Sequence, residues 1–110
     1  MPDVTQERRI APRYPLVLSA EITEPASGVK VMARTSDISR SGCYLDTLNP
    51  TPEDAQIRLR LIRGEEAFET EARVVYASPG LGMGARFLEQ VKENQLVVLD
   101  RWLGEAARNL

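Results

Sequence analysis

The chain has 110 residues, with 14 basic and 16 acidic side chains, no histidine and a single cysteine. This length suits one domain, and the net charge of −2 argues against a general nucleic-acid binder, which usually carries a large basic excess. Without histidine, the chain cannot build histidine metal sites or Ser-His and Cys-His pairs, and one cysteine excludes a disulfide within the chain.

The N-terminal quarter of the chain is predicted to form an arm followed by a hairpin. Residues 1–14 are polar, and Pro12 and Pro15 disfavour helix in the residues before them, so we expect an extended arm. Residues 16–24 alternate between apolar and polar side chains, which is typical of a half-buried strand. A second strand over 29–36, after a Pro-Ala-Ser-Gly turn, completes the hairpin.

The remainder of the chain is predicted to form more short strands and a helix. After a loop over residues 37–42, further strands are expected at 43–45, 56–63, 67–77 and 83–88. Leucines then recur every three or four residues, which predicts an amphipathic helix over 90–109. We therefore expect a single all-β domain over residues 1–110, with an antiparallel six-stranded barrel at 16–88 and the helix packed on it.

The densest positive charge lies on the arm. Arg8, Arg9 and Arg13 stand close together there, and the planar guanidinium group suits both phosphate and the edge of guanine. The plain alternative is a solvated arm without a binding role.

A second feature is the segment from Asp37 to Gly42, DISRSG, between two predicted strands. Asp37 could accept hydrogen bonds from a purine, and Ser39 could bond a phosphate. Gly42 could allow a close approach of the backbone or a positive φ. Because Asp, Ser and Gly are also common turn residues, an ordinary loop is the alternative.

The two features together form an ordered pair of motifs. Arg9 to Arg13 is an RxxxR sequence, and Asp37 to Gly42 is a DxSxxG sequence that follows it on a predicted barrel. This combination resembles the PilZ domain family, the receptor modules for the bacterial second messenger cyclic di-GMP. The likeness extends from about residue 7 to about residue 108 and includes the segments RRIAPRYPL, DISRSGCYL and GMGARF.

The resemblance implies a cyclic di-GMP site in which the arm wraps the ligand. Arg8 stands directly before the RxxxR motif, a position that implies a stacked pair of ligands, and hence two per chain. Tyr76 ends a predicted strand where relatives often place an aromatic ring near the ligand, although core packing is equally open for it. The implied ligand-binding residues are Arg8, Arg9, Arg13, Asp37, Ser39, Gly42 and Tyr76.

These observations predict a receptor that is not an enzyme and that needs no metal or cofactor besides its ligand. We expect the arm to change conformation on binding and to signal to an unidentified downstream protein. No apolar run approaches ~18 residues and no secretory signal is present, so we expect a cytoplasmic protein without a membrane span. The alternatives are a ligand-independent PilZ-type interaction module in motility or pilus assembly, and a small nucleic-acid-binding barrel. Cys43 and Trp102 are expected to pack in the core.

Overall fold

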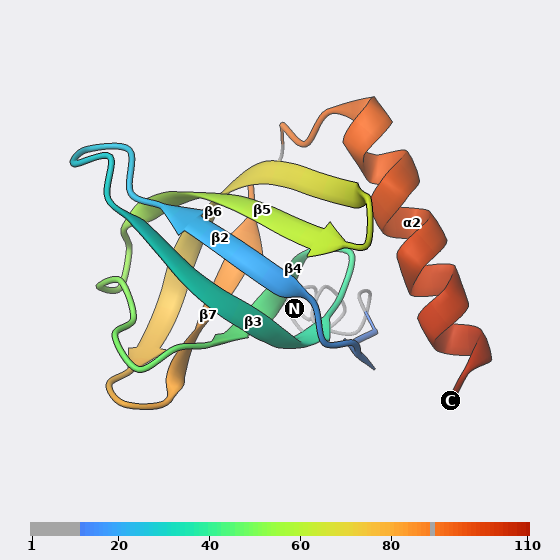
Figure 1. Cartoon of the computed structure of the whole chain (residues 1–110), viewed down its shortest axis with the longest axis horizontal. Helices are drawn as coiled ribbons and strands as arrows, with labels where there is room; N and C mark the ends of the chain where they lie inside the picture. The colour runs from blue at the N-terminus through green and yellow to red at the C-terminus, as the bar shows by residue number, and fades with distance from the viewer. Residues whose placement is uncertain (1–11, 89) are drawn as a thin grey trace, which may run out of the picture.

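A computed structural model of the chain describes residues 12–88 and 90–110. This part of the chain folds into a barrel of antiparallel strands with one helix lying against one end of it (Figure 1). The elements are β1 Tyr14–Pro15, β2 Ser19–Thr23, β3 Lys30–Ile38, β4 Gly42–Asp46, β5 Gln56–Arg63, β6 Glu66–Ser78, β7 Gly82–Phe87 and α2 Glu93–Arg108.

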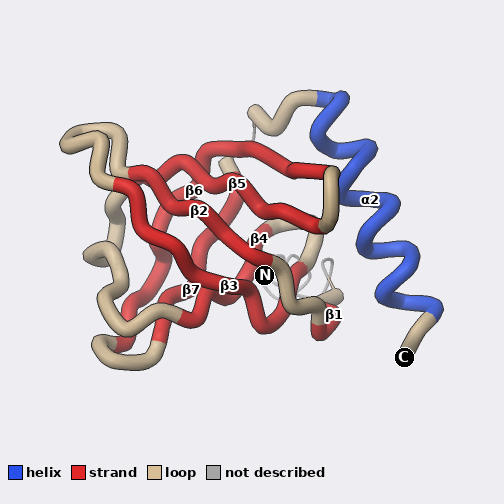
Figure 2. Tube along the Cα trace, viewed as in Figure 1, coloured by secondary structure: helices blue, strands red, loops and turns tan. Residues whose placement is uncertain are grey.

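Six of the strands close on themselves. Their order is β3-β2-β5-β6-β7-β4, and β4 pairs again with β3, so the barrel has no free edge among these strands. The seventh, β1, pairs with the end of β3 from outside the barrel, with Tyr14 opposite Ile38 (Figure 2). The predicted antiparallel barrel with a C-terminal helix is therefore confirmed, with β1 as an additional outside strand.

The core follows the alternation in the sequence. In β5, Ile57, Leu59 and Leu61 are fully buried, while the arginines between them are exposed. Helix α2 contributes Leu99, Trp102, Leu103 and Ala106 to the apolar interior. Trp102 is fully buried and its Nε1 donates a hydrogen bond of 3.0 Å to Glu66 Oε1 at the start of β6. The helix is thus held by packing and by a polar contact at its rim.

The first predicted strand is interrupted by a threonine of β3. The buried Thr35 hydroxyl accepts a hydrogen bond from Leu18 N at 2.9 Å and donates one to Leu16 O at 2.6 Å. This side chain takes the place of a backbone partner, so the predicted strand over 16–24 is shortened to β2, and the separate strand β1 lies before it at the end of the predicted arm.

Two other predicted boundaries were wrong. Strand β3 continues through Ile38, so Asp37 is a strand residue rather than part of the predicted loop. A register shift between Thr35 and Asp37 accompanies this extension. Helix α2 begins at Glu93 rather than at residue 90.

Candidate functional site

A continuous row of residues crosses the outer surface of four strands beside the DxSxxG motif. Cross-strand pairing places Asp37 of β3 opposite Tyr44 of β4, Tyr44 opposite Gly84 of β7, and Gly84 opposite Tyr76 of β6. Residues directly opposite each other share one face of a sheet, and neighbouring strands are about 4.8 Å apart. We call these four residues the tyrosine row; it spans about 14 Å of the barrel wall.

Glycines of β7 form the floor on which both tyrosine rings lie. A Cβ atom at Gly84 would come 2.5 Å from the Tyr76 ring, and one at Gly82 would come 2.8 Å from Tyr44 Oη. The two rings lie side by side, with centroids 6.1 Å apart and planes inclined by 32°. The close approach at these two glycines is therefore between strand backbone and aromatic rings.

Tyr76 is a wall residue and not a core residue, since 44% of its surface is exposed. Sequence reasoning missed Tyr44, which lies in the row between Asp37 and Gly84. The alternation of the strand contained a signal, because Tyr44 stands between the inward-facing Cys43 and Leu45.

The two motifs meet at an ion pair at one end of the row. Arg13 Nη2 lies 2.7 Å from Asp37 Oδ1, and Arg13 Nε donates to the same oxygen at 3.1 Å. Both side chains are partly exposed, at 52% and 35%. The pairing of β1 with β3 sets this contact, because it anchors the residue after Arg13 beside Ile38. Arg8 and Arg9 lie outside the described residues.

Ser39 is turned inward and shapes the β3–β4 turn. Its side chain is buried, and its Oγ accepts hydrogen bonds from Ser41 N at 3.1 Å and Gly42 N at 3.2 Å. The hydroxyl also lies 3.3 Å from Gly42 O, which it reaches as a donor. All of these contacts are within the motif, so the hydroxyl fixes the turn that carries Asp37 and Gly42.

The close approach of β7 requires a glycine at position 42. A Cβ atom at this position would lie 2.2 Å from the Ala85 carbonyl oxygen, which a strand pairing cannot accommodate without moving the backbone. Its φ is not positive; the described glycines with positive φ are Gly28, Gly64 and Gly80. Of the two reasons expected for this glycine, close backbone approach therefore applies and positive φ does not.

Cys43 lies beneath the row, within the core. Burial raises the pKa of its thiol to about 12, the Asp37 carboxylate adds to the rise, and Arg13 opposes it. A thiol that stays protonated at neutral pH is neither a nucleophile nor a metal ligand. The structure thus confirms the core role expected for Cys43.

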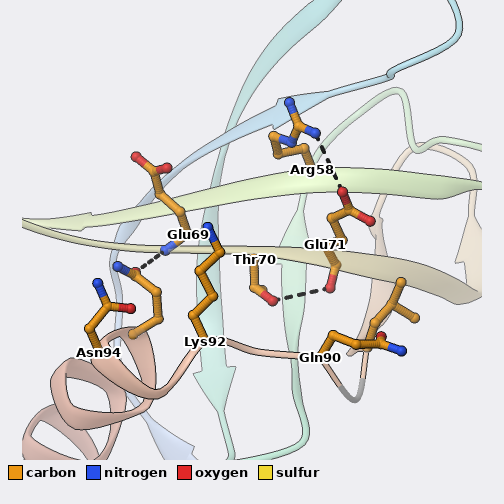
Figure 3. A pocket seen from close by; sticks show the side chains of 9 residues that line it. Arg58, Glu69, Thr70, Glu71, Gln90, Lys92 and Asn94 are labelled. Atoms are coloured by element: carbon orange, nitrogen blue, oxygen red, sulfur yellow. Dashed lines mark hydrogen bonds and ion pairs between the residues drawn. The ribbon is translucent and has the colours of Figure 1, made fainter.

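A cavity of about 580 Å³ lies away from the motifs, between the outer faces of β5 and β6 and the start of α2 (Figure 3). Two contacts join residues of its lining: the backbone Glu69 N donates to Gln95 Oε1 at 2.7 Å, and Arg58 lies 3.4 Å from Glu71. None of its lining residues belongs to either motif or to the tyrosine row. We therefore place the candidate site on the wall and not in this cavity.

A profile of the PilZ domain family matches residues 7–105, a span that includes both motifs. The chain belongs to the PilZ domain family. PilZ domains are receptor and adaptor modules rather than enzymes. No curated protein matched the sequence. Among the described residues, no helix is long and apolar enough to cross a membrane.

Solved structures of PilZ proteins share the fold of this chain. The PilZ domain of YcgR from Escherichia coli with c-di-GMP has a TM-score of 0.76 at 18% identity, covering 93% of each chain. The motility inhibitor MotI/DgrA of Bacillus subtilis has a TM-score of 0.76 at 19% identity, covering 93% of this chain and 52% of that protein. The PilZ domain of CeSA from a cellulose-synthesizing bacterium has a TM-score of 0.69 at 20% identity, covering 84% of this chain and 98% of that domain.

The chain spans about half the length of two of these proteins, 52% of MotI/DgrA and 47% of YcgR in its longer structure with c-di-GMP. At such identities the likeness establishes the fold of this chain.

Proposed function

We propose that this PilZ domain is a receptor for cyclic di-GMP that binds the nucleotide on the tyrosine row. The observation that carries the proposal is the direct contact of the two motifs, Arg13 with Asp37, at one end of the half-buried Tyr44 ring and the exposed Tyr76 ring. The family membership and the c-di-GMP in the E. coli YcgR PilZ structure support the choice of ligand.

The chemistry of the row suits a cyclic dinucleotide. Arg9 and Arg13 offer guanidinium groups to phosphate oxygens or to the O6/N7 edge of guanine. Asp37 offers a carboxylate to guanine N–H donors, and the rings of Tyr44 and Tyr76 offer stacking faces to the bases. Such a site combines positive charge, directional hydrogen bonds and apolar stacking contact, all of which a guanine dinucleotide requires.

When the ligand binds, Arg13 and Asp37 separate from each other and bond to the ligand instead. A half-exposed ion pair contributes at most about 1 kcal/mol, so separating its groups costs little. Each group is then free to bond the ligand, and Arg13 draws the arm toward the wall. This change in the arm is the signal, and an unidentified downstream protein reads it.

Ser39 and Gly42 support the site through the turn that they form. The Ser39 hydroxyl ties together the turn after Asp37, and Gly42 allows β4 to approach β7. Both residues thereby determine where Asp37 and Tyr44 stand. We propose that binding requires neither a metal nor a cofactor and that the bound nucleotide is released intact.

Two ligands per chain are proposed from the position of Arg8. Two stacked molecules bring four phosphate charges together, and a third guanidinium group before the RxxxR motif offsets part of their repulsion. Equilibrium dialysis at protein concentrations well above the dissociation constant should reach two molecules per chain, and Arg8→Leu should reach one. A plateau at one ligand in the unmutated protein would contradict the stoichiometry but not the binding.

The central test is calorimetric titration of the purified chain with cyclic di-GMP, with GMP as the control ligand. We expect saturable binding of the dinucleotide and much weaker binding of GMP, because one nucleotide cannot engage both ends of the row. Absence of heat and of dialysis retention with cyclic di-GMP would refute the proposed function. Overnight incubation followed by chromatography should return the ligand unchanged, and linear dinucleotide above the buffer control would overturn the receptor assignment.

A further inference from the structure

Two arginines face each other on the wall, in the row next to the tyrosine row. Arg73 of β6 is directly opposite Arg86 of β7, and Arg86 is directly opposite Gly42 of β4. Like charges at directly opposite positions of an antiparallel pair destabilise a sheet. The fold therefore places two like charges at directly opposite positions of this strand pairing.

The rest of the described surface avoids such contacts. The described residues include ten arginines, of which seven lie within 4.0 Å of a carboxylate: Arg13, Arg34, Arg40, Arg58, Arg60, Arg63 and Arg101. Among these ten, Arg73, Arg86 and Arg108 have no carboxylate partner within the described part of the chain. The two that face each other are thus two of the three described arginines without a carboxylate partner.

Within residues 12–88 and 90–110, no neighbouring carboxylate forms an ion pair with Arg73 or Arg86. Arg73 Nη1 donates to the backbone carbonyl of Asp54 at 2.9 Å, which orients its guanidinium group but supplies no charge. Glu71, two positions earlier on the same strand, already accepts hydrogen bonds from Gln56 at 2.8 Å and Arg58 at 3.4 Å. Positive charge therefore remains concentrated at this point.

The pair is also within reach of the proposed ligand. Arg86 stands two residues beyond Gly84 on β7, a separation of about 6.7 Å along the strand, so both positions lie on the same side of β7, and Arg86 is exposed there. On its other side, Gly42 has no side chain to cover the guanidinium group. Arg13 lies at the β3 end of the tyrosine row, so the wall has cations on two of its sides.

We propose that Arg73 and Arg86 form an anion subsite that holds a phosphate of the bound dinucleotide from the barrel side. This inference rests on the proposed function and extends it to two residues outside both motifs. Two adjacent guanidinium groups bind a phosphate oxygen pair with charge-assisted hydrogen bonds. The bound anion in turn removes the repulsion between the two arginines, so the contact that is unfavourable in the free protein becomes favourable in the complex.

The test replaces each arginine by glutamine, which keeps the hydrogen-bonding side chain and removes the charge. Arg73→Gln and Arg86→Gln are titrated with cyclic di-GMP beside the wild type, and Arg108→Gln is the matched control because Arg108 is exposed and lies in the last turn of α2. We expect each wall variant to bind about tenfold more weakly, with a smaller dependence of affinity on salt concentration. The control should bind like the wild type.

A second readout uses the repulsion in the free protein. Without ligand, Arg86→Gln should melt at the same temperature as the wild type or up to about 5 °C higher, because the like-charge contact is gone. Weaker binding together with undiminished thermal stability supports a ligand subsite. Weaker binding with a clearly lower melting temperature would mean a structural role and would overturn the proposal.

The remaining outcomes separate the two proposals. If the wild type binds cyclic di-GMP and both wall variants bind equally well, the subsite is wrong and the receptor function stands. If the wild type does not bind cyclic di-GMP at all, the proposed function fails first, and the subsite fails with it.

Discussion

Strand β6 contributes to two outer faces of the barrel that differ in how their charges are matched. Over its first half, opposite charges face each other across the pairing with β5, as Glu69 does with Arg60 at 3.0 Å. Over its second half, Arg73 faces Arg86, and the Tyr76 ring covers a glycine of β7. The first face satisfies its own groups, whereas the second leaves cations and ring faces available.

This difference separates a scaffold surface from the proposed ligand surface on the same strand. Matched exposed ion pairs gain little from any additional partner, because their charges are already balanced and solvated. Unmatched cations beside stacking faces gain hydrogen bonds and charge neutralisation only when an anionic aromatic ligand arrives. Changes on the two faces should therefore have different consequences.

The largest expected effect is on stability, through the pairing of β4 with β7 beneath the proposed ligand face. Gly42→Ala should destabilise the fold by about 1–3 kcal/mol, because its Cβ would lie 2.2 Å from the Ala85 carbonyl oxygen and β4 would have to move from β7. Chemical denaturation measures this change. Gly104→Ala in α2 is the matched control: its nearest contact is 3.8 Å away, and the substitution should stabilise by about 0.5–1 kcal/mol. Equal stability of Gly42→Ala and wild type would show that the two strands are not tightly constrained.

Arg13→Ala should weaken cyclic di-GMP binding by about tenfold or more, because a bidentate arginine–guanine contact contributes roughly 1–3 kcal/mol. Arg58→Ala is the control on the scaffold face, since Arg58 is similarly exposed and pairs with Glu71. Calorimetry should show loss of affinity only for Arg13→Ala, while melting temperatures without ligand remain close to that of the wild type. Equal affinities for the two variants would contradict the distinction between the faces.

Tyr76→Ala should weaken binding by about tenfold, since one base–aromatic stack contributes roughly 1–3 kcal/mol. Tyr76→Phe should bind like the wild type, because it keeps the ring over Gly84 and removes only the hydroxyl. The pair of variants, compared by titration, separates stacking from hydrogen bonding. Weakened binding by Tyr76→Phe would assign the contribution to the hydroxyl group.

The smallest expected effect concerns Glu66, where α2 meets β6. The pKa of its carboxyl is lowered by the hydrogen bonds that Trp102 and Arg101 donate to it. A lowered pKa in the folded state means that the charged carboxylate contributes stability above the ordinary glutamate pKa of about 4.3, and that this contribution is lost as the pH falls through the folded value. The melting temperatures of wild type and Glu66→Gln should therefore differ most near neutral pH and converge under acid. A constant difference between pH 3 and pH 7 would exclude this linkage.

Much of this molecule could be predicted from residue types and spacing. The alternation over residues 56–63 and 67–77 predicted two strands, because burial of one face of a strand requires a period of two. The predicted inward face is correct up to Val74, where a register shift turns Tyr76 to the outside. The leucine spacing predicted the C-terminal helix. The order of the RxxxR and DxSxxG motifs indicated the family and the region of the site, since both motifs are local in the sequence.

Contacts between distant segments were decided only by the tertiary structure. The side-chain contact between Arg13 and Asp37 depends on β1 pairing with β3, and the meeting of Tyr44 with Gly82 depends on β4 pairing with β7. Strand register arises from the packing of the whole core, because a shift by one residue would turn every side chain to the other face. No local pattern records which residue will be opposite which. The sequence by itself therefore determined the elements and the motif residues, while the closing of the barrel decided that Ser39 supports a turn and that Arg73 and Arg86 face each other on the wall.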